Sequence, residues 1–196
     1  MSTPESLRIL PEQWLNPINF AACFEHPERR FEIDLGCGKG RFLLARAGKF
    51  PETNFLGIDR QLGRIERIDR KGLRAGLTNL RVLRLDGYYT VTYLVPAQSV
   101  DTYYIFYPDP WPKGKHHHNR IFNEPFMDAI ARTLKPGGQL HASTDHLPYF
   151  KEIYKLIKAD KRFEETEPFV PAEDEVSDFE LMFAHKQPGR CSFIRK

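Results

Sequence analysis

Phe31-Glu-Ile-Asp-Leu-Gly-Cys-Gly-Lys-Gly40 reads as a short apolar strand that runs directly into a glycine-rich turn, and Arg41–Lys49 continues with the pattern of a helix. Glycines at such a junction let the backbone approach a ligand closely, and the start of the helix offers free N–H groups. The stretch therefore predicts a strand, a ligand-binding loop and a helix in succession. A tight structural turn or a dinucleotide site would give the same string, so its surroundings must decide.

The alternation of strands and helices continues along the chain. Further strands are expected at residues 54–58, 80–85, 100–106 and 139–143, and further helices at 61–75, 123–134 and 147–159. This rhythm predicts an α/β, Rossmann-like fold with a mostly parallel seven-stranded sheet and helices on both faces. Phe179–Phe183 alternates and Cys191–Ile194 is short and apolar, which predicts a C-terminal antiparallel strand pair. Residues 1–30 are expected to form an N-terminal lead-in to a single domain at 31–196.

Composition limits the class of protein. A chain of 196 residues with 41% hydrophobic content can bury one sizeable core. Its three cysteines form no CxxC pair, which fits a reducing compartment and neither a disulfide framework nor a zinc ribbon. The N-terminus has no signal-peptide pattern, and no apolar run approaches the ~20 residues that cross a bilayer. We therefore expect a cytoplasmic protein with no membrane partner.

Charge is unevenly distributed in a chain whose net charge is +3. Between Arg60 and Arg84 there are eight Lys or Arg residues and two acids, whereas Glu164–Glu180 contains eight acids and no Lys or Arg. On the helix expected at 61–75, apolar residues take the face opposite a basic stripe. The stripe is formed by Arg60, Arg64, Arg67, Lys71 and Arg74. It predicts a polyanionic partner, with a merely solvated face as the alternative.

Acidic residues end the first three strands, at Asp34, Asp59 and Asp86. Asp59 stands 19 residues after Gly40, where a carboxylate can accept both hydroxyls of a ribose. Three acids around one pocket would repel a pyrophosphate but suit a ligand with a ribose, an ammonium and a sulfonium, which describes S-adenosylmethionine. NAD is the weaker alternative because the glycine spacing is GxGxG. Asp86 has a second interpretation as a turn-former before Gly87. Backbone contacts to the cofactor are expected at Gly36, Gly38 and Gly40.

Tyr107-Pro-Asp-Pro-Trp-Pro-Lys113 follows the strand expected at 100–106. Its three prolines lack N–H donors and are expected to push each preceding residue toward extended geometry. Because ligands collect at the carboxyl ends of strands in open α/β sheets, Asp109 is placed for chemistry rather than for packing. Trp111 can stack on a base or simply cover the sheet edge. The histidines at 116–118 follow one another on a loop with no acid or cysteine at suitable spacing, so no metal site is predicted.

With Asp34–Gly40, Gly57-Ile-Asp59, Asp86 and Tyr107–Arg120 in register, the chain resembles the bacterial tRNA (guanine-N7-)-methyltransferases, a class I S-adenosylmethionine-dependent family. The Pro-Asp-Pro-Trp-Pro-Lys string is the most specific element of the resemblance. Ser143-Thr-Asp145 and Ser177-Asp-Phe-Glu180 are similar to two further motifs of that family. The resemblance implies a single methyltransferase domain at 31–196, in which Asp34, Asp59, Asp86 and Asp109 line the cofactor and catalytic site.

The same resemblance implies substrate contacts from Lys113, Asp145, Ser177, Asp178, Phe179 and Glu180. Asp145 can instead cap the helix that begins at Leu147. The chain departs from the family pattern at several positions: aspartates stand at 34 and 59 where glutamate is usual, Ser177 and Phe179 replace threonine and tyrosine, and Gly114 and Asn119 replace basic residues.

The function expected from these features is methyl transfer from S-adenosylmethionine to N7 of a tRNA guanine, with the variable-loop guanine implied by the resemblance. A methyltransferase for another RNA or for a small molecule, and a non-catalytic RNA-binding module, are the alternatives. Asp109 is the expected catalytic residue, as a fixed carboxylate that stabilises positive charge on the base. The protein is expected to act as a monomer or homodimer. Contacts to the RNA backbone are expected from Arg64, Arg67, Lys71, Arg74, Lys115 and Arg120.

Overall fold

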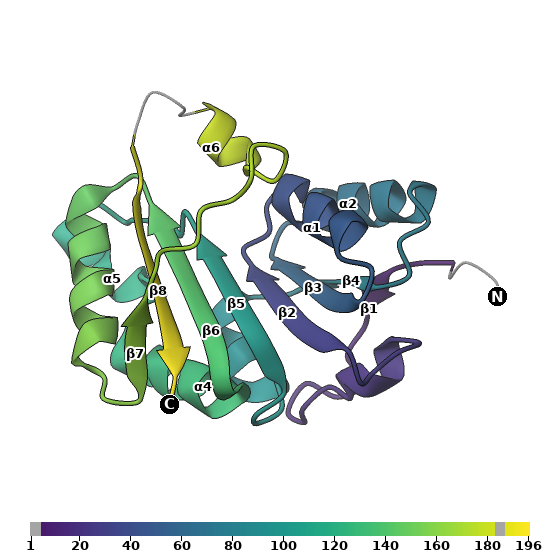
Figure 1. The fold of residues 1–196 in the computed structure, drawn as a ribbon, viewed down its shortest axis with the longest axis horizontal. Coiled ribbons are helices and arrows are strands. Elements are labelled where there is room, and N and C mark those ends of the chain that lie inside the picture. Colours follow the sequence, from purple (N-terminus) through teal and green to yellow (C-terminus); the bar gives the residue numbers. More distant parts are fainter. Residues whose placement is uncertain (1–4, 183–186) are drawn as a thin grey trace.

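The computed structural model describes residues 5–182 and 187–196, which form an eight-stranded sheet with helices on both faces (Figure 1). The strands are β1 (Arg8–Ile9), β2 (Arg30–Leu35), β3 (Thr53–Asp59), β4 (Leu80–Arg84), β5 (Val100–Phe106), β6 (Leu134–Thr144), β7 (Phe163–Thr166) and β8 (Gly189–Arg195). Their order across the sheet is β1-β4-β3-β2-β5-β6-β8-β7. All neighbours are parallel except β8, which is antiparallel to both β6 and β7.

Four longer helices cover the sheet: α1 (Arg41–Lys49), α2 (Leu62–Arg74), α4 (Glu124–Thr133) and α5 (Leu147–Ala159). Helices α1 and α2 pack on one face around a core that includes Leu43, Phe55 and Ile65. Helices α4 and α5 pack on the other face, where the core includes Phe126 and Ile153. The mostly parallel α/β fold predicted from the βαβ pattern is confirmed. Inner strands such as β2 and β3 bury consecutive side chains, so both of their faces need cover.

Shorter helical segments lie between these elements: η1 (Phe20–Cys23), α3 (Gly87–Tyr89), the π-helix η2 (Thr90–Leu94), the 3₁₀-helix η3 (Gly114–Asn119) and α6 (Asp178–Met182). None of them is among the helices expected at 41–49, 61–75, 123–134 and 147–159. In the described part of the chain, no helix has both the length and the apolar character that crossing a bilayer requires.

The bounds of the regular elements agree closely with the prediction. The expected helices at Arg41–Lys49 and Leu147–Ala159 are α1 and α5, and the expected strand at Val100–Phe106 is β5. The sheet has one strand more than the seven predicted, because Arg8–Ile9 from the lead-in pairs with β4. The helix expected at 123–134 is α4, which ends at Thr133, and β6 begins at Leu134, five residues before the strand expected at 139–143.

The C-terminal antiparallel pair is present, but its predicted first strand was wrong. Phe163–Thr166 pairs with β8, with Phe163 opposite Arg195 and Thr166 opposite Ser192. Asp178–Met182 is a short helix instead, and Phe183 lies outside the described residues. Residues 179–182 span barely one helical turn, so alternation over so few positions distinguishes a strand poorly from a helix.

The strand order places the site. Chain connections run outward in opposite directions from β2 and β5, which are adjacent and parallel. In open α/β sheets, ligands bind at the carboxyl ends of the strands on either side of such a switch point.

Candidate active site

An open hollow of about 770 Å³ lies at the carboxyl ends of β2, β3, β4 and β5. Its volume falls in the range of roughly 300–1,000 Å³ that is typical of ligand pockets. The predicted site residues that line it are Gly36, Asp59, Arg64, Asp86, Asp109 and Arg120. Apolar and aromatic side chains make up much of the remaining wall, among them Leu35, Ile58, Leu85, Tyr88, Ile105 and Trp111. Four strands thus bring together residues that are up to 84 positions apart (36 to 120).

The glycine turn is held in place by Asp59 and by the end of β3. The amides of Gly36 and Cys37 donate to the Ile58 carbonyl at 2.8 and 3.0 Å. The Asp59 carboxylate accepts from the amide of Gly38 at 3.1 Å and from that of Gln61 at 2.8 Å. These bonds orient a nearly buried carboxylate at the rim of the hollow, in the position expected for a ribose acceptor.

Asp34 and two of the predicted glycines do not line the hollow. Asp34 is buried behind the wall, where burial and then the Asp59 charge raise the pKa of its carboxyl to about 8. Gly38 contributes its amide to Asp59, and Gly40 begins α1 as its N-cap. The two glycines thus shape the turn and do not form the surface of the hollow.

Gly40 is required by its conformation and by the closeness of α2. Its φ of +77° lies in the left-handed region, and an added Cβ would sit 2.4 Å from Cγ1 of Ile68. Gly40→Ala is therefore expected to lower the free energy of unfolding by about 2–4 kcal/mol, measured by urea denaturation. The matched control is Gly48→Ala in the same helix, where an added Cβ meets no atom within 4 Å. That change should stabilise the protein by roughly 0.5–1 kcal/mol, and an equal loss in both variants would contradict this account.

Asp86 caps a helical segment and also lines the hollow. One of its carboxylate oxygens caps the helical segment that begins at Gly87, accepting from the Tyr89 amide at 2.9 Å. The other oxygen faces Arg60 at 3.8 Å, and the residue lines the hollow. A capping aspartate can thus still present an oxygen to a ligand.

The proline-rich loop turns sharply at two positions. Tyr107 and Trp111 both precede a proline, and they have φ values of +52° and +41° instead of the extended geometry that we predicted. Left-handed backbone is costly for such residues and persists only where the surroundings hold it. Here the Tyr107 amide donates to the Ser143 carbonyl at 2.7 Å, and Arg120 Nε donates to the Pro110 carbonyl at 2.8 Å. The two turns place Asp109 on the wall of the hollow, with 72% of its side chain exposed.

The basic stripe divides into two parts. Arg60 precedes α2 and points to the site, with its guanidinium 3.8 Å from Asp86 and 4.0 Å from Asp109. Arg64 pairs with Asp59 at 3.1 Å and lines the hollow. The outer, exposed face of α2 keeps Arg67, Lys71 and Arg74.

The basic residues after the proline loop also differ in placement. Lys113 and Lys115 are exposed. Arg120 is buried: its guanidinium pairs with Glu152 and lies 4.7 Å from the Tyr149 ring, so it braces the loop against α5 rather than facing solvent. We therefore do not retain Arg120 as a phosphate contact. No group of three or more His, Cys, Asp or Glu in the described residues is arranged to hold a metal ion.

The predicted substrate residues of the C-terminal segment lie beside the hollow, not in its wall. The Ser177 hydroxyl accepts from the Glu180 amide at 3.1 Å, and Glu180 pairs with Arg190. The Phe179 ring is 4.7 Å from the Tyr107 ring, so α6 packs directly on the proline-rich loop. Asp178 is half-buried at the start of α6.

Asp145, which directly follows β6, lies near the same tyrosine, Tyr107. Burial, and next the charge of Glu180, raise the pKa of Tyr107 to about 12, with a smaller contribution from Asp145. The N-cap of α5 is His146, whose Nδ1 accepts from the Tyr149 amide at 3.2 Å, and not Asp145.

Sequence reasoning missed Tyr107 and Arg190 as site residues and assigned Arg60 only to the basic stripe. The position of Arg60 directly after a strand-ending aspartate was a usable signal, because neighbouring strand ends meet at one edge of the sheet. Arg190 carried no local signal, since its approach to Glu180 depends on how the last strand enters the sheet.

Comparison with known proteins agrees with this geometry. Residues 28–185 match the family described as "Putative methyltransferase". The chain is 39% identical to a tRNA (guanine-N(7)-)-methyltransferase of Halorhodospira halophila, over 71% of this chain and 62% of the relative. It is 34% identical to the corresponding protein of Nitrosococcus oceani, over 79% of this chain and 69% of the relative.

The fold is also that of solved methyltransferases. The 16S rRNA methyltransferase KamB aligns with a TM-score of 0.63 at 15% identity, covering 85% of this chain and 88% of KamB. The chain spans roughly 62–69% of the length of the relatives from Halorhodospira halophila and Nitrosococcus oceani. The match to the family model, the identity to these relatives and the acidic proline-rich loop agree on one assignment: the chain belongs to the tRNA (guanine-N7-)-methyltransferase family.

Proposed function

We propose that the protein transfers the methyl group of S-adenosylmethionine to N7 of a guanine in tRNA, at the variable loop. The observation that carries the proposal is the placement of Asp109, which the proline-rich loop holds on the wall of the same hollow as Asp59 and Asp86. The family to which the chain belongs supports the choice of reaction and substrate.

The residues of the hollow fit S-adenosylmethionine. Asp59 is oriented by two backbone amides and offers oxygens that a ribose can donate to. The half-exposed carboxylate of Asp86 and the apolar wall around Leu85 suit an adenine ring. Once ionised, the buried carboxyl of Asp34 would stabilise the positively charged ammonium and sulfonium groups of bound S-adenosylmethionine. The cofactor supplies an electrophilic methyl group, which no side chain of the protein provides.

Guanine N7 carries an in-plane lone pair, so attack on a methyl group needs no general base. The protein's main contribution is then to align nucleophile, methyl carbon and sulfur, which can account for ~7–11 kcal/mol of the barrier. The base gains positive charge as it is methylated. Asp109 would stabilise that charge because it is fixed by two sharp turns and faces the hollow.

Selection of guanine is assigned to carboxylates next to the proline-rich loop. Asp145 and Glu180 both lie close enough to Tyr107 to raise the pKa of its hydroxyl. Ionised carboxylates only accept hydrogen bonds, and guanine offers N1–H and an amino group on one edge. Adenine would leave a carboxylate facing an acceptor, so the arrangement favours guanine.

The decisive test incubates the protein with radiolabelled S-adenosylmethionine and tRNA that lacks base modifications, followed by digestion to nucleosides. We expect label in 7-methylguanosine, and none when the variable-loop guanine is replaced by adenine. Label in another nucleoside would point to a different RNA methyltransferase. Label transfer only to small molecules would contradict the proposal.

The outer face of α2 is the proposed contact for tRNA phosphates. Reversing two exposed charges there, with Arg67→Glu and Lys71→Glu together, should weaken tRNA binding and lower the slope of log affinity against log salt by about two. Fluorescence titration at several salt concentrations measures both quantities. The matched control reverses Lys155 and Lys161, two exposed basic residues in and just after α5, on the other face of the sheet. Equal effects of the two double variants would show that only net charge matters.

A further inference from the structure

Residues 167–177, here called the strap, connect β7 to α6. From β7 the strap crosses the face of the sheet in front of β8 and β6 and then reaches α6 above the strand ends (Figure 1). It covers the part of that face that α1 and α2 leave open. Within the described residues, no helix lies over β5 and β6 on this face, and the strap completes the core there (Figure 1).

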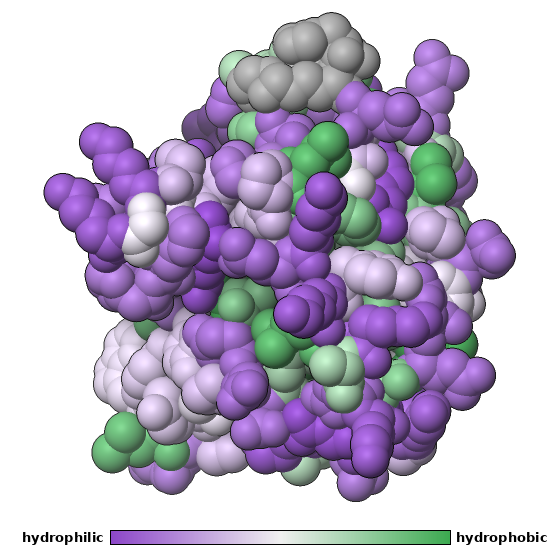
Figure 2. Space-filling model, turned by 90° about the vertical axis from the view of Figure 1, so that its left-hand side faces the viewer, coloured by the Kyte–Doolittle hydropathy of each residue, from purple (hydrophilic) through white to green (hydrophobic). Residues whose placement is uncertain are grey.

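An aromatic side chain anchors the first half of the strap. The Phe169 ring lies 4.9 Å from His141, 5.3 Å from Tyr104 and 6.2 Å from Phe42, which belong to β6, β5 and α1. Its amide donates to Ser192 Oγ at 2.8 Å. The strap is therefore attached to the centre of the sheet. The surface on the side of the molecule that carries α5 is largely hydrophilic (Figure 2).

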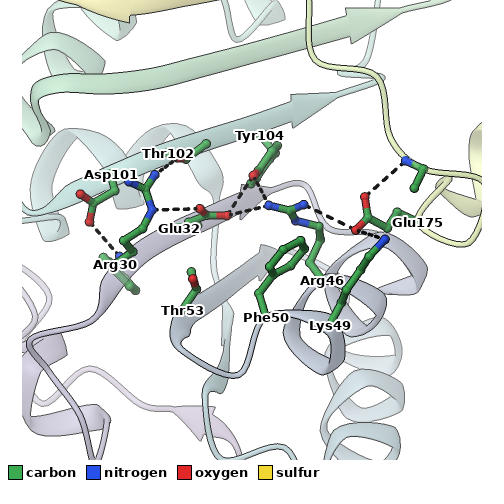
Figure 3. Close-up of polar contacts among 12 residues, drawn as sticks. Arg30, Glu32, Arg46, Lys49, Phe50, Thr53, Asp101, Thr102, Tyr104 and Glu175 are labelled. Carbon is green, nitrogen blue, oxygen red and sulfur yellow. Dashed lines mark hydrogen bonds and ion pairs between the residues drawn. The ribbon is translucent and has the colours of Figure 1, made fainter.

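A buried ion network anchors the second half. Arg46 in α1 lies between two carboxylates, with Nη1 3.5 Å from Glu175 and Nη2 3.5 Å from Glu32 (Figure 3). The Tyr104 hydroxyl donates to Glu32 at 2.9 Å and accepts from Arg46 at 3.0 Å. Lys49 adds a contact to Glu175 at 3.4 Å. One guanidinium thus joins the strap to the centre of the sheet.

The exposed fractions show that this network sits in the interior. Side-chain exposure is 13% for Arg46, 6% for Glu32 and 4% for Glu175. Burying charges costs free energy that their attraction repays only in part, so such a network is a weak source of stability. The network instead provides position. A slip of the strap by one residue would replace Glu175 either with Asp174, whose side chain is one methylene shorter, or with the uncharged Val176.

The position of the strap matters because the proposed substrate segment comes directly after it. Arg41 Nε donates to the Val176 carbonyl at 3.0 Å, and the next residue is Ser177, which begins the segment proposed to contact guanine. Helix α1 itself starts at the end of the glycine turn, with Gly40 as its N-cap. The same helix therefore carries the cofactor turn at one end and the strap along its side.

We propose that Arg46 and Glu175 are positioning residues, which set the register of the strap and so hold Ser177–Glu180 at a fixed distance from the cofactor turn. This inference rests on the proposed function for its catalytic consequence. Neither residue touches the hollow, so both act through the segment that they hold.

The test is Glu175→Gln, which keeps the side chain's shape and removes its charge. We expect kcat/KM for tRNA to fall by about 10- to 100-fold, because small misplacements of substrate-positioning groups have effects of this size. The Kd for S-adenosylmethionine should stay within about twofold of the wild-type value, since the glycine turn is unchanged. Amide hydrogen exchange at residues 172–180 should become faster in the protein alone, while β5 exchanges as before.

The matched control is Glu173→Gln, which removes the same charge from an exposed residue two positions earlier in the strap. It should leave kcat/KM, cofactor affinity and exchange unchanged. The proposal is overturned if Glu175→Gln behaves like this control in activity and in exchange. Hydrogen exchange requires no substrate. If Glu175→Gln exchanges faster than the wild type but the wild type has no methyltransferase activity, the proposed function is rejected and the role of Glu175 in setting the register of the strap is retained.

A second variant guards against loss of folding in Glu175→Gln. Arg41 is exposed, so Arg41→Gln removes the bond to Val176 without disturbing a buried charge. We expect a rise of about three- to tenfold in KM for tRNA with an unchanged slope against salt. An unchanged KM would count against the proposal. A slope of log affinity against log salt that is lower by about one would also count against it, because it would mark Arg41 as a lost phosphate contact.

Discussion

Asp109→Ala is expected to lower kcat for tRNA methylation by about 10²- to 10³-fold, the size of effect seen when one fixed group that stabilises transition-state charge is removed. Asp109 lines the hollow and is held there by the left-handed turns at Tyr107 and Trp111. Its carboxylate contributes nothing to phosphate binding, so the Kd for tRNA should change by about twofold at most. Single-turnover kinetics with saturating enzyme measures the first quantity, and filter binding the second.

Two further variants sharpen this prediction. Asp109→Asn keeps the shape and removes the charge, and it should be nearly as slow as alanine if charge stabilisation is the role. Asp128→Ala is the matched control, because the Asp128 side chain is 69% exposed against 72% for Asp109, and each faces an arginine. The control should be fully active. Equal losses of kcat and tRNA affinity in Asp109→Ala would assign the residue to binding instead.

Asp34 should make cofactor affinity depend on pH. Burial and then the Asp59 charge raise the pKa of its carboxyl from 3.8 to about 8, so the free protein holds this proton at neutral pH. A sulfonium favours the ionised form, and its affinity should therefore rise with pH up to about pH 8, by as much as tenfold per unit. S-adenosylhomocysteine has a neutral sulfur and should show a weaker dependence. Calorimetric titration from about pH 6 to about pH 9 measures both ligands.

The same carboxyl should affect folding with a defined sign. Between pH 3.8 and about 8 the folded protein binds the Asp34 proton and the unfolded chain does not. The free energy of unfolding should therefore decrease as pH rises through this window and level off above it. Asp34→Asn should remove this part of the slope and also the difference between the two ligands. If the asparagine variant keeps both, another group is responsible.

Much of the site could be predicted locally. Asp59 and Asp86 directly follow the apolar runs predicted as strands at 54–58 and 80–85, and Asp109 comes three residues after the run at 100–106. Because parallel strands place their carboxyl ends at one edge, four carboxylates, including Asp34, were expected to converge there. The hollow contains Asp59, Asp86 and Asp109, whereas Asp34 is buried and does not line it.

Other parts of the site could not be predicted in this way. Arg60 and Arg64 fit the basic stripe by spacing, yet both turn toward carboxylates. Arg64 reaches back to Asp59, five residues earlier, whereas Arg60 reaches Asp86 only because β3 and β4 are paired. Trp111 and Tyr107 take left-handed backbone because distant partners hold the loop, among them the Ser143 carbonyl.

By itself, the order of residues determined the parallel α/β fold, the glycine turn, the acidic strand ends and the bounds of α1 and α5, since these depend on periodicity and on the chemistry of adjacent residues. Only the tertiary structure decided that Phe163–Thr166 pairs with β8 and that Arg190 meets Glu180. It also decided that Arg46 joins Glu32 to Glu175, which lies 129 positions after Arg46 in the chain. The physical reason is that pairing partners and buried ions are selected by what the whole sheet leaves uncovered, and no short stretch of sequence contains that information.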